Sequence, residues 1–204
     1  MDDLLQLDAF LSPEERLIRE DVARFVQDKI MPDLPSAFEK GEFPATWVSA
    51  CANMGFFGLT TPAAYQGSAV SALAYGLICQ ELERGDSGLR SFISVQNSLC
   101  MEPIYRFGSE AQKQHYLPLM AQGQCIGCFG LTEPEAGSDP SSMKTVAKKV
   151  KGGYILTGNK MWITNGPIAD IAIIWAKIES GIRGFLVPKE AEGFQRLTMH
   201  HKMS

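Results

Sequence analysis

Apolar residues recur every three or four positions through the first 122 residues of the chain, which predicts helices. The first helix has a clear start, since Ser12 is a candidate N-cap, Pro13 suits the first helical position and Glu15 completes a capping box. Pro32 is expected to end this helix. Four more helices are predicted: over residues 44–54, over residues 71–84, after Ser87-Gly88, and from Ser109, which forms a capping box with Gln112.

The pattern changes near Gly123, where short β-prone runs separated by Gly, Asn and Pro begin. Lys151-Gly152-Gly153 is typical of a hairpin turn between two of them. The predicted strands are Cys125–Leu131, Thr145–Val150, Tyr154–Thr157, Met161–Thr164, Ile171–Ala176 and Gly184–Val187. The expected fold is α+β, with an N-terminal α-helical domain over residues 1–122 and a mostly antiparallel β domain over residues 123–204.

The composition fits a folded chain, because 45% of the 204 residues are hydrophobic and 21% are charged. With 19 Lys and Arg against 23 Asp and Glu the net charge is −4, which argues against nucleic acid or an anionic membrane as a partner. No stretch approaches the ~20 apolar residues of a membrane-spanning helix. The N-terminus, MDDLLQLDAF, is acidic where a signal peptide is basic. We therefore expect a cytoplasmic protein that binds small molecules or other proteins.

Cysteine and histidine residues do not indicate a metal site. Cys125 and Cys128 have CxxC spacing, but no second pair completes a zinc site, and residues three apart on a strand point to opposite faces. All five cysteines are expected to be reduced core thiols. His115 is expected at the surface, and no carboxylate cluster accompanies His200 and His201. No metal is predicted.

The segment Cys128–Ser142, CFGLTEPEAGSDPSS, gathers Gly, Thr, Ser and Asp in a turn that leaves a predicted strand. Backbone N–H groups and hydroxyls freed there can hold a phosphate or the polar edge of a ring. The residues alone fit a long polar loop equally well, because the segment is neither a P-loop nor a GxGxxG motif. Composition and spacing alone therefore do not decide whether this segment binds a ligand.

This segment and a second one, LTGNKMWITNG over Leu156–Gly166, resemble the two flavin-contacting segments of the acyl-CoA dehydrogenase family in order and spacing. The region Glu81–Leu99, ELERGDSGLRSFISVQNSL, narrows the resemblance to the glutaryl-CoA dehydrogenases. The resemblance implies helical, β and C-terminal four-helix-bundle domains, of which this chain has the first two. The family's catalytic Glu lies in the third domain, so no catalytic residue is expected here. We expect a truncated protein that is inactive in isolation.

The resemblance also implies that FAD is the cofactor. Thr132 would bond the pyrimidine side of the flavin, Ser138 would lie near the pyrophosphate and the acyl-CoA, and Thr164 would lie near N5. Trp162 would cover the ring, whereas the simpler interpretation makes it a core aromatic. The implied cofactor-binding residues are Phe129, Gly130, Leu131, Thr132, Glu133, Pro134, Gly137, Ser138, Trp162, Ile163 and Thr164.

Arg90 is the residue expected to set substrate choice. It lies among apolar residues, where a guanidinium is costly to bury without an anionic partner, and a planar guanidinium suits a carboxylate. In the resembling enzymes Arg90 would bind the distal carboxylate of glutaryl-CoA, with Ser91 assisting and Glu83 holding the arginine. The alternative is a surface arginine capped by Asp86.

The implied reaction is the oxidation of glutaryl-CoA followed by loss of CO₂ to give crotonyl-CoA, with electrons passing to electron-transfer flavoprotein. A homo-oligomer, usually a tetramer in the family, is also implied. Two alternatives stay open. One is a short-chain or non-decarboxylating acyl-CoA dehydrogenase, and the other is a non-catalytic fragment or binding module.

Overall fold

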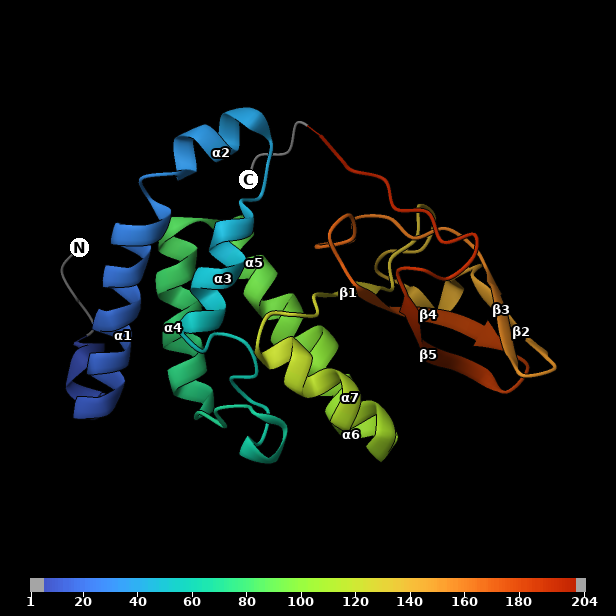
Figure 1. Cartoon of the computed structure of the whole chain (residues 1–204), viewed down its shortest axis with the longest axis horizontal. Helices are drawn as coiled ribbons and strands as arrows, with labels where there is room; N and C mark the ends of the chain where they lie inside the picture. Colours follow the sequence, from blue (N-terminus) through green and yellow to red (C-terminus); the bar gives the residue numbers. More distant parts are fainter. Residues whose placement is uncertain (1–5, 201–204) are drawn as a thin grey trace.

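The computed structural model describes residues 6–200, which form a helical part followed by a sheet (Figure 1). Two π-helical stretches, η2 (Val26–Ile30) and η4 (Val95–Met101), continue α1 and α5. The α-helices are α1 (Pro13–Phe25), α2 (Leu34–Lys40), α3 (Ala45–Asn53), α4 (Ala72–Gly85), α5 (Ser87–Ser94), α6 (Glu102–Phe107) and α7 (Glu110–Ala121).

The helix starts predicted from the sequence are confirmed. Ser12 Oγ accepts the Glu15 N–H at 3.2 Å and Glu15 Oε2 accepts the Ser12 N–H at 2.8 Å, and Ser109 and Gln112 make the same exchange before α7. The turn that contains Pro32 follows η2, so the first helix ends where expected. Helix α2 was not predicted, because it has only seven residues and its N-cap makes no side-chain hydrogen bond.

The β domain expected from the sequence is confirmed, because most of the paired residues lie in antiparallel pairs, and the sheet is mixed because it also contains parallel pairs. Its strands follow the order β1-β4-β2-β3, with β5 beside β4. The pairs β2–β3 and β4–β5 are antiparallel, while β4 runs parallel to both β1 and β2. Sequence pattern shows hairpins between neighbours but not pairing across long connections. The strands are β1 (Gly127–Gly130), β2 (Val146–Val150), β3 (Gly153–Thr157), β4 (Ile171–Ile178) and β5 (Gly181–Pro188).

The strand predicted over Met161–Thr164 is wrong. This segment is irregular, and Trp162 and Asn165 adopt the left-handed backbone with φ of +61° and +66°. Extended chain needs negative φ, so these two residues end any strand whatever the β-propensity of the side chains. The segment instead loops back, and the Met161 N–H donates to the Thr132 carbonyl at 2.9 Å.

A buried glutamine joins the helices to the sheet. The amide Nε2 of Gln96, in η4, donates to the carbonyls of Met120 at 3.3 Å and Cys125 at 2.9 Å. Its Oε1 accepts the N–H of Gly127, the first residue of β1, at 2.8 Å. An apolar cluster that includes Val95 of η4 and residues of α7 and β4 surrounds this junction. The start of β1 is therefore fixed against η4, and the functional residues described below lie on both sides of this contact.

Candidate cofactor and substrate site

The two segments predicted to contact a flavin meet at one cavity of about 260 Å³. They come from distant parts of the sheet domain and are joined by the backbone bond between Met161 and Thr132. Two residues of η4 that line the cavity were not predicted from the sequence. The only sequence signal for them is that they lie four positions apart and so share one face of a helix. The lining residues are Phe129, Leu131, Thr132, Trp162, Ile163, Thr164 and, from η4, Val95 and Leu99.

The first segment leaves β1 as a tight turn. The N–H of Glu133 donates to the Ala136 carbonyl at 3.0 Å and the N–H of Ala136 returns a bond to Glu133 at 3.2 Å, which places Pro134 at an exposed tip. Gly137 and Ser138 follow on the exposed side, and a Cβ at Gly137 would meet nothing within 4 Å. These last residues do not line the small cavity, so their contact with a cofactor stays a prediction.

The buried carboxylate of Glu133 is fully engaged within the protein. It accepts the N–H groups of Lys144 at 2.6 Å and Thr145 at 3.0 Å, the Thr145 hydroxyl, and the Lys160 ammonium at 2.8 Å. Burial by itself would raise the pKa of Glu133, but these donors outweigh it and lower the pKa to about 2. The side chain of Glu133 therefore anchors the turn, a role that the sequence pattern did not reveal.

The side chains around the small cavity fit a flat cofactor with a polar edge. Trp162 is 63% exposed, which excludes its interpretation as a core aromatic. The Phe129 ring is held edge-on by Trp175 at 5.9 Å between ring centres. Within residues 6–200 the hydroxyls of Thr132 and Thr164 have no hydrogen-bond partner. Apolar and aromatic surfaces with two free hydroxyls match the isoalloxazine ring of a flavin.

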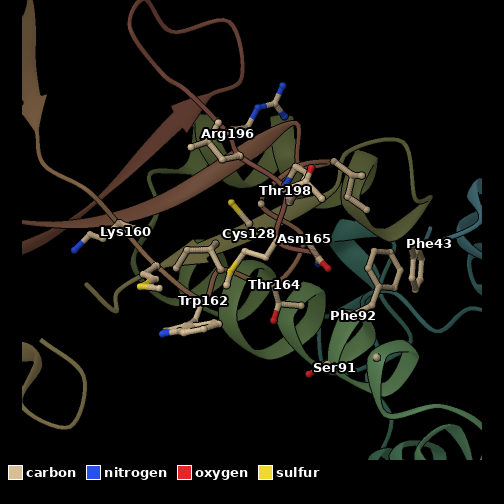
Figure 2. A pocket seen from close by; sticks show the side chains of 18 of the residues that line it. Phe43, Ser91, Phe92, Cys128, Lys160, Trp162, Thr164, Asn165, Arg196 and Thr198 are labelled. Carbon is tan, nitrogen blue, oxygen red and sulfur yellow. The ribbon is translucent and has the colours of Figure 1, made fainter. Parts of the chain in front are cut away.

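A larger cavity, of about 2610 Å³, separates the helical part from the sheet domain and includes Trp162, Ile163 and Thr164 on its β side. Figure 2 shows Ser91 and Phe92 of α5 on one side of this space and Trp162, Thr164 and Asn165 on the other. The chain from β5 to residue 200 arches over this space (Figure 1). The predicted cofactor residues Trp162, Ile163 and Thr164 thus border the same opening as the predicted substrate residues Arg90 and Ser91.

Arg90 lines the large cavity and is 34% exposed at its side chain. Its Nε donates to Glu83, as predicted, and its NH1 donates to the Ser94 hydroxyl at 3.2 Å. Asp86 instead caps α5 by accepting the Leu89 N–H at 2.7 Å, so the alternative of an arginine capped by the Asp86 side chain is wrong. Among residues 6–200 the NH2 group and the second NH1 hydrogen of Arg90 have no partner. One face of the guanidinium is therefore left for an anion.

Cys125 and Cys128 are buried thiols rather than a redox or metal pair. Cys125 and Cys128 pack in two different apolar clusters, and burial raises the pKa of each to about 11. His115 is exposed, as predicted, and His201 lies outside the described residues. Between residues 6 and 200 no group of three or more His, Cys, Asp or Glu side chains could hold a metal. In the same range no helix is long and apolar enough to cross a membrane.

A helical domain, a mixed sheet and an aromatic cavity with free hydroxyls define a protein that binds a flat cofactor between two domains. Residues 12–124 match the acyl-CoA dehydrogenase N-terminal domain, and residues 128–204 match the acyl-CoA dehydrogenase middle domain. The chain therefore belongs to the acyl-CoA dehydrogenase family.

The relatives of this chain are named for different acyl-CoA substrates. A glutaryl-CoA dehydrogenase from Mycobacterium smegmatis in complex with FADH2 is 46% identical, with a TM-score of 0.96 over 99% of this chain and 52% of that one. A second structure of glutaryl-CoA dehydrogenase from the same organism is 50% identical, with a TM-score of 0.95 over 100% of this chain and 52% of that one. Mitochondrial isovaleryl-CoA dehydrogenase of Pongo abelii is 38% identical over 90% of this chain and 46% of its own length. The chain thus spans about half the length of these relatives.

Proposed function

We propose that this chain supplies the first two domains of an FAD-dependent enzyme that converts glutaryl-CoA to crotonyl-CoA and CO₂. The observation that carries the proposal is the guanidinium of Arg90. It lies on the cavity shared with Trp162 and Thr164 and is held so that part of it remains open to an anion.

FAD, when bound, supplies the acceptor for the hydride that leaves the β-carbon of the substrate. Phe129, Leu131 and Trp162 offer apolar surface to its ring, and the hydroxyls of Thr132 and Thr164 can donate to its polar atoms. Ser138 and Gly137, on the exposed side of the turn, would lie toward the pyrophosphate. Both the FADH2 complex from Mycobacterium smegmatis and an FAD complex of an acyl-CoA dehydrogenase from Bacillus anthracis support this cofactor.

The role of Arg90 is to recognise a carboxylate at the far end of the acyl group. A guanidinium has five N–H donors, and Glu83 and Ser94 each take one. The remaining donors lie on the two terminal nitrogens, so a carboxylate can approach end-on and bind both. Ser91, the next residue on α5, lines the same cavity and can add a hydroxyl. A monocarboxylic acyl group offers this face nothing to bind.

The small cavity has no acid or base of its own, because none of its eight lining residues is ionisable. We therefore assign the proton abstraction from the α-carbon to a Glu of the third domain, as the family resemblance implies. The β-carbon C–H bond breaks with its electron pair leaving as hydride. The distal carboxylate then leaves as CO₂, and the γ-carbon that keeps the electron pair of the broken C–C bond takes up a proton to give crotonyl-CoA. Arg90 must hold that carboxylate during the first step and release it in the second.

Electrons would pass from the enzyme to electron-transfer flavoprotein, and the complete protein would form a homo-oligomer. An electron-transferring flavoprotein structure from Acidaminococcus fermentans is 34% identical to this chain, with a TM-score of 0.89 over 100% of this chain. The name of that structure is that of the proposed electron acceptor, and its matching chain has the fold of this one, so the acceptor itself stays part of the proposal.

A second candidate is an isovaleryl-CoA dehydrogenase, favoured by the names of several curated relatives that are 34–38% identical. The two candidates differ in one product. The complete enzyme, given glutaryl-CoA labelled at its distal carboxylate, should release labelled CO₂ and form crotonyl-CoA faster than it oxidises isovaleryl-CoA. Faster oxidation of isovaleryl-CoA without CO₂ release would overturn the proposal. A preparation that binds no FAD would favour the non-catalytic alternative.

A further inference from the structure

The side chain of Lys160 connects the two segments that line the small cavity and is almost entirely buried, while the residue also borders the large cavity. The Lys160 side chain is 9% exposed and that of Glu133 is 6% exposed. The ammonium donates to the Leu131 carbonyl at 2.9 Å and to Glu133 Oε1 at 2.8 Å. Leu131 lines the cavity from the first segment, and Trp162, two residues after Lys160, lines it from the second. One side chain thus ties both walls together.

The partner of Lys160 is itself fixed to the sheet. Glu133 accepts backbone N–H groups of Lys144 and Thr145, immediately before β2. The aliphatic part of Lys160 passes beside Gly130, where an added Cβ would come within 3.4 Å of Lys160 Cγ. The Lys160 ammonium is therefore held by several buried contacts rather than by an exposed ion pair.

The neighbouring backbone needs such support. Trp162 has φ of +61°, a conformation that costs a bulky residue free energy and persists only where the surroundings impose it. Met161, between Lys160 and Trp162, bonds Thr132 through its N–H group at 2.9 Å. Lys160 and this bond hold the chain just before the strained residue, and Trp162 has its indole largely exposed at the cavity.

We infer that Lys160 is a positioning residue that sets the Trp162–Thr164 wall of the cavity against the Leu131–Thr132 wall. The inference rests on the proposed function only in naming FAD as the molecule between the walls. Lys160 acts through its ion pair with Glu133 and its hydrogen bond to the Leu131 carbonyl, and it does not contact the cofactor.

Hydrogen exchange of this chain with the substitution Lys160→Met tests the inference without any cofactor. Glu133 keeps the donors of Lys144 and Thr145, so the chain should fold. The Met161 amide, which donates to the Thr132 carbonyl between the two segments, should exchange roughly tenfold or more faster, because the segment loses a hydrogen bond to a charged group, while the amides of β4 stay protected. The control is Lys144→Met, which removes an exposed ion pair with Glu135 from the same region. It should leave both regions unchanged.

The affinity for FAD gives the second measurement. Titration of FAD fluorescence should show weaker binding by Lys160→Met, by roughly tenfold, and unchanged binding by Lys144→Met. Unchanged exchange of the Met161 amide, or loss of protection throughout the chain, would overturn the inference, because Lys160 would then be dispensable or needed for the whole fold. If the complete protein binds no FAD while the exchange result holds, the proposed function fails and the positioning role stands.

Discussion

Glu83 of α4 and Arg90 of α5 form an ion pair across the tight connection between the two helices. The Glu83 carboxylate accepts a hydrogen bond from Nε of the arginine, and the hydroxyl of Ser94, one turn further along α5, accepts one from NH1. The guanidinium is therefore oriented before any substrate arrives. Preorganisation of this kind reduces the side-chain entropy lost on binding.

Ser94→Ala should reduce kcat/KM of the complete enzyme for glutaryl-CoA by about 2- to 10-fold, because the hydrogen bond that the Arg90 guanidinium donates to the Ser94 hydroxyl is lost and Arg90 is held less firmly. Butyryl-CoA should be affected little, since it has no distal carboxylate. Ser98→Ala is the matched control, because Ser98 bonds Tyr75 instead of Arg90. Steady-state kinetics on both substrates measure the effect. Equal losses of kcat/KM on glutaryl-CoA and butyryl-CoA would show that Ser94 has no role in substrate recognition.

The stability of the chain should fall as the pH drops from about 4.5 to about 2. The pKa of Glu133 is lowered in the folded state, so its carboxylate stabilises the fold above the unfolded pKa and loses this effect as the pH falls to the folded value. The contribution is up to about 3 kcal/mol. Urea unfolding of the wild type and of Glu133→Gln across this range isolates it. A constant difference between the two proteins would contradict the assignment.

Thiol reagents should label Cys79 first. Burial raises the pKa of Cys51 to about 12 and that of Cys125 and Cys128 to about 11, and Cys79 is the half-buried one. The thiolate is the reactive form, so the buried thiols should react only as the chain opens. Mass spectrometry after timed labelling at pH 8 provides the order. Early labelling of Cys125 and Cys128, or a disulfide between them, would contradict it.

The 204-residue chain alone should not reduce FAD with glutaryl-CoA. The small cavity has no ionisable lining residue, and Glu133, nearby in sequence, is held by Lys160 with a pKa of about 2, too low for a general base. Absorbance of the oxidised flavin should persist when the three components are mixed. Bleaching at a normal catalytic rate would show that a base exists within the chain.

Local signals predicted most of the helices and the hairpin, because caps such as Ser12 and Ser109 act within one turn. The parallel pairing of β4 with β1 could not be predicted from the sequence, because it joins residues more than 40 positions apart. The strand over Met161–Thr164 was mispredicted because the bond to Thr132 and the positive φ of Trp162 override local propensity.

The candidate site was located through motif resemblance, and the structure adds what motifs cannot supply. Trp162 and Thr164 meet Thr132 at one cavity only because the chain loops back after β3. The Lys160–Glu133 pair was missed, because a lysine and a glutamate 27 positions apart give no sequence signal of burial. The contact of Arg90 with Glu83 was predicted. The hydrogen bond of Arg90 to Ser94, four residues later on the same helix, was not predicted.

The most direct test of the account is the substitution Arg90→Gln in the complete enzyme, measured on glutaryl-CoA and butyryl-CoA. Gln lacks the charge and leaves the distal carboxylate without its partner, a loss of about 2–5 kcal/mol. The specificity constant for glutaryl-CoA should fall roughly 30- to several-thousand-fold, while that for butyryl-CoA changes little or rises. Equal losses on the two substrates would show that Arg90 is structural and would contradict the assignment of glutaryl-CoA.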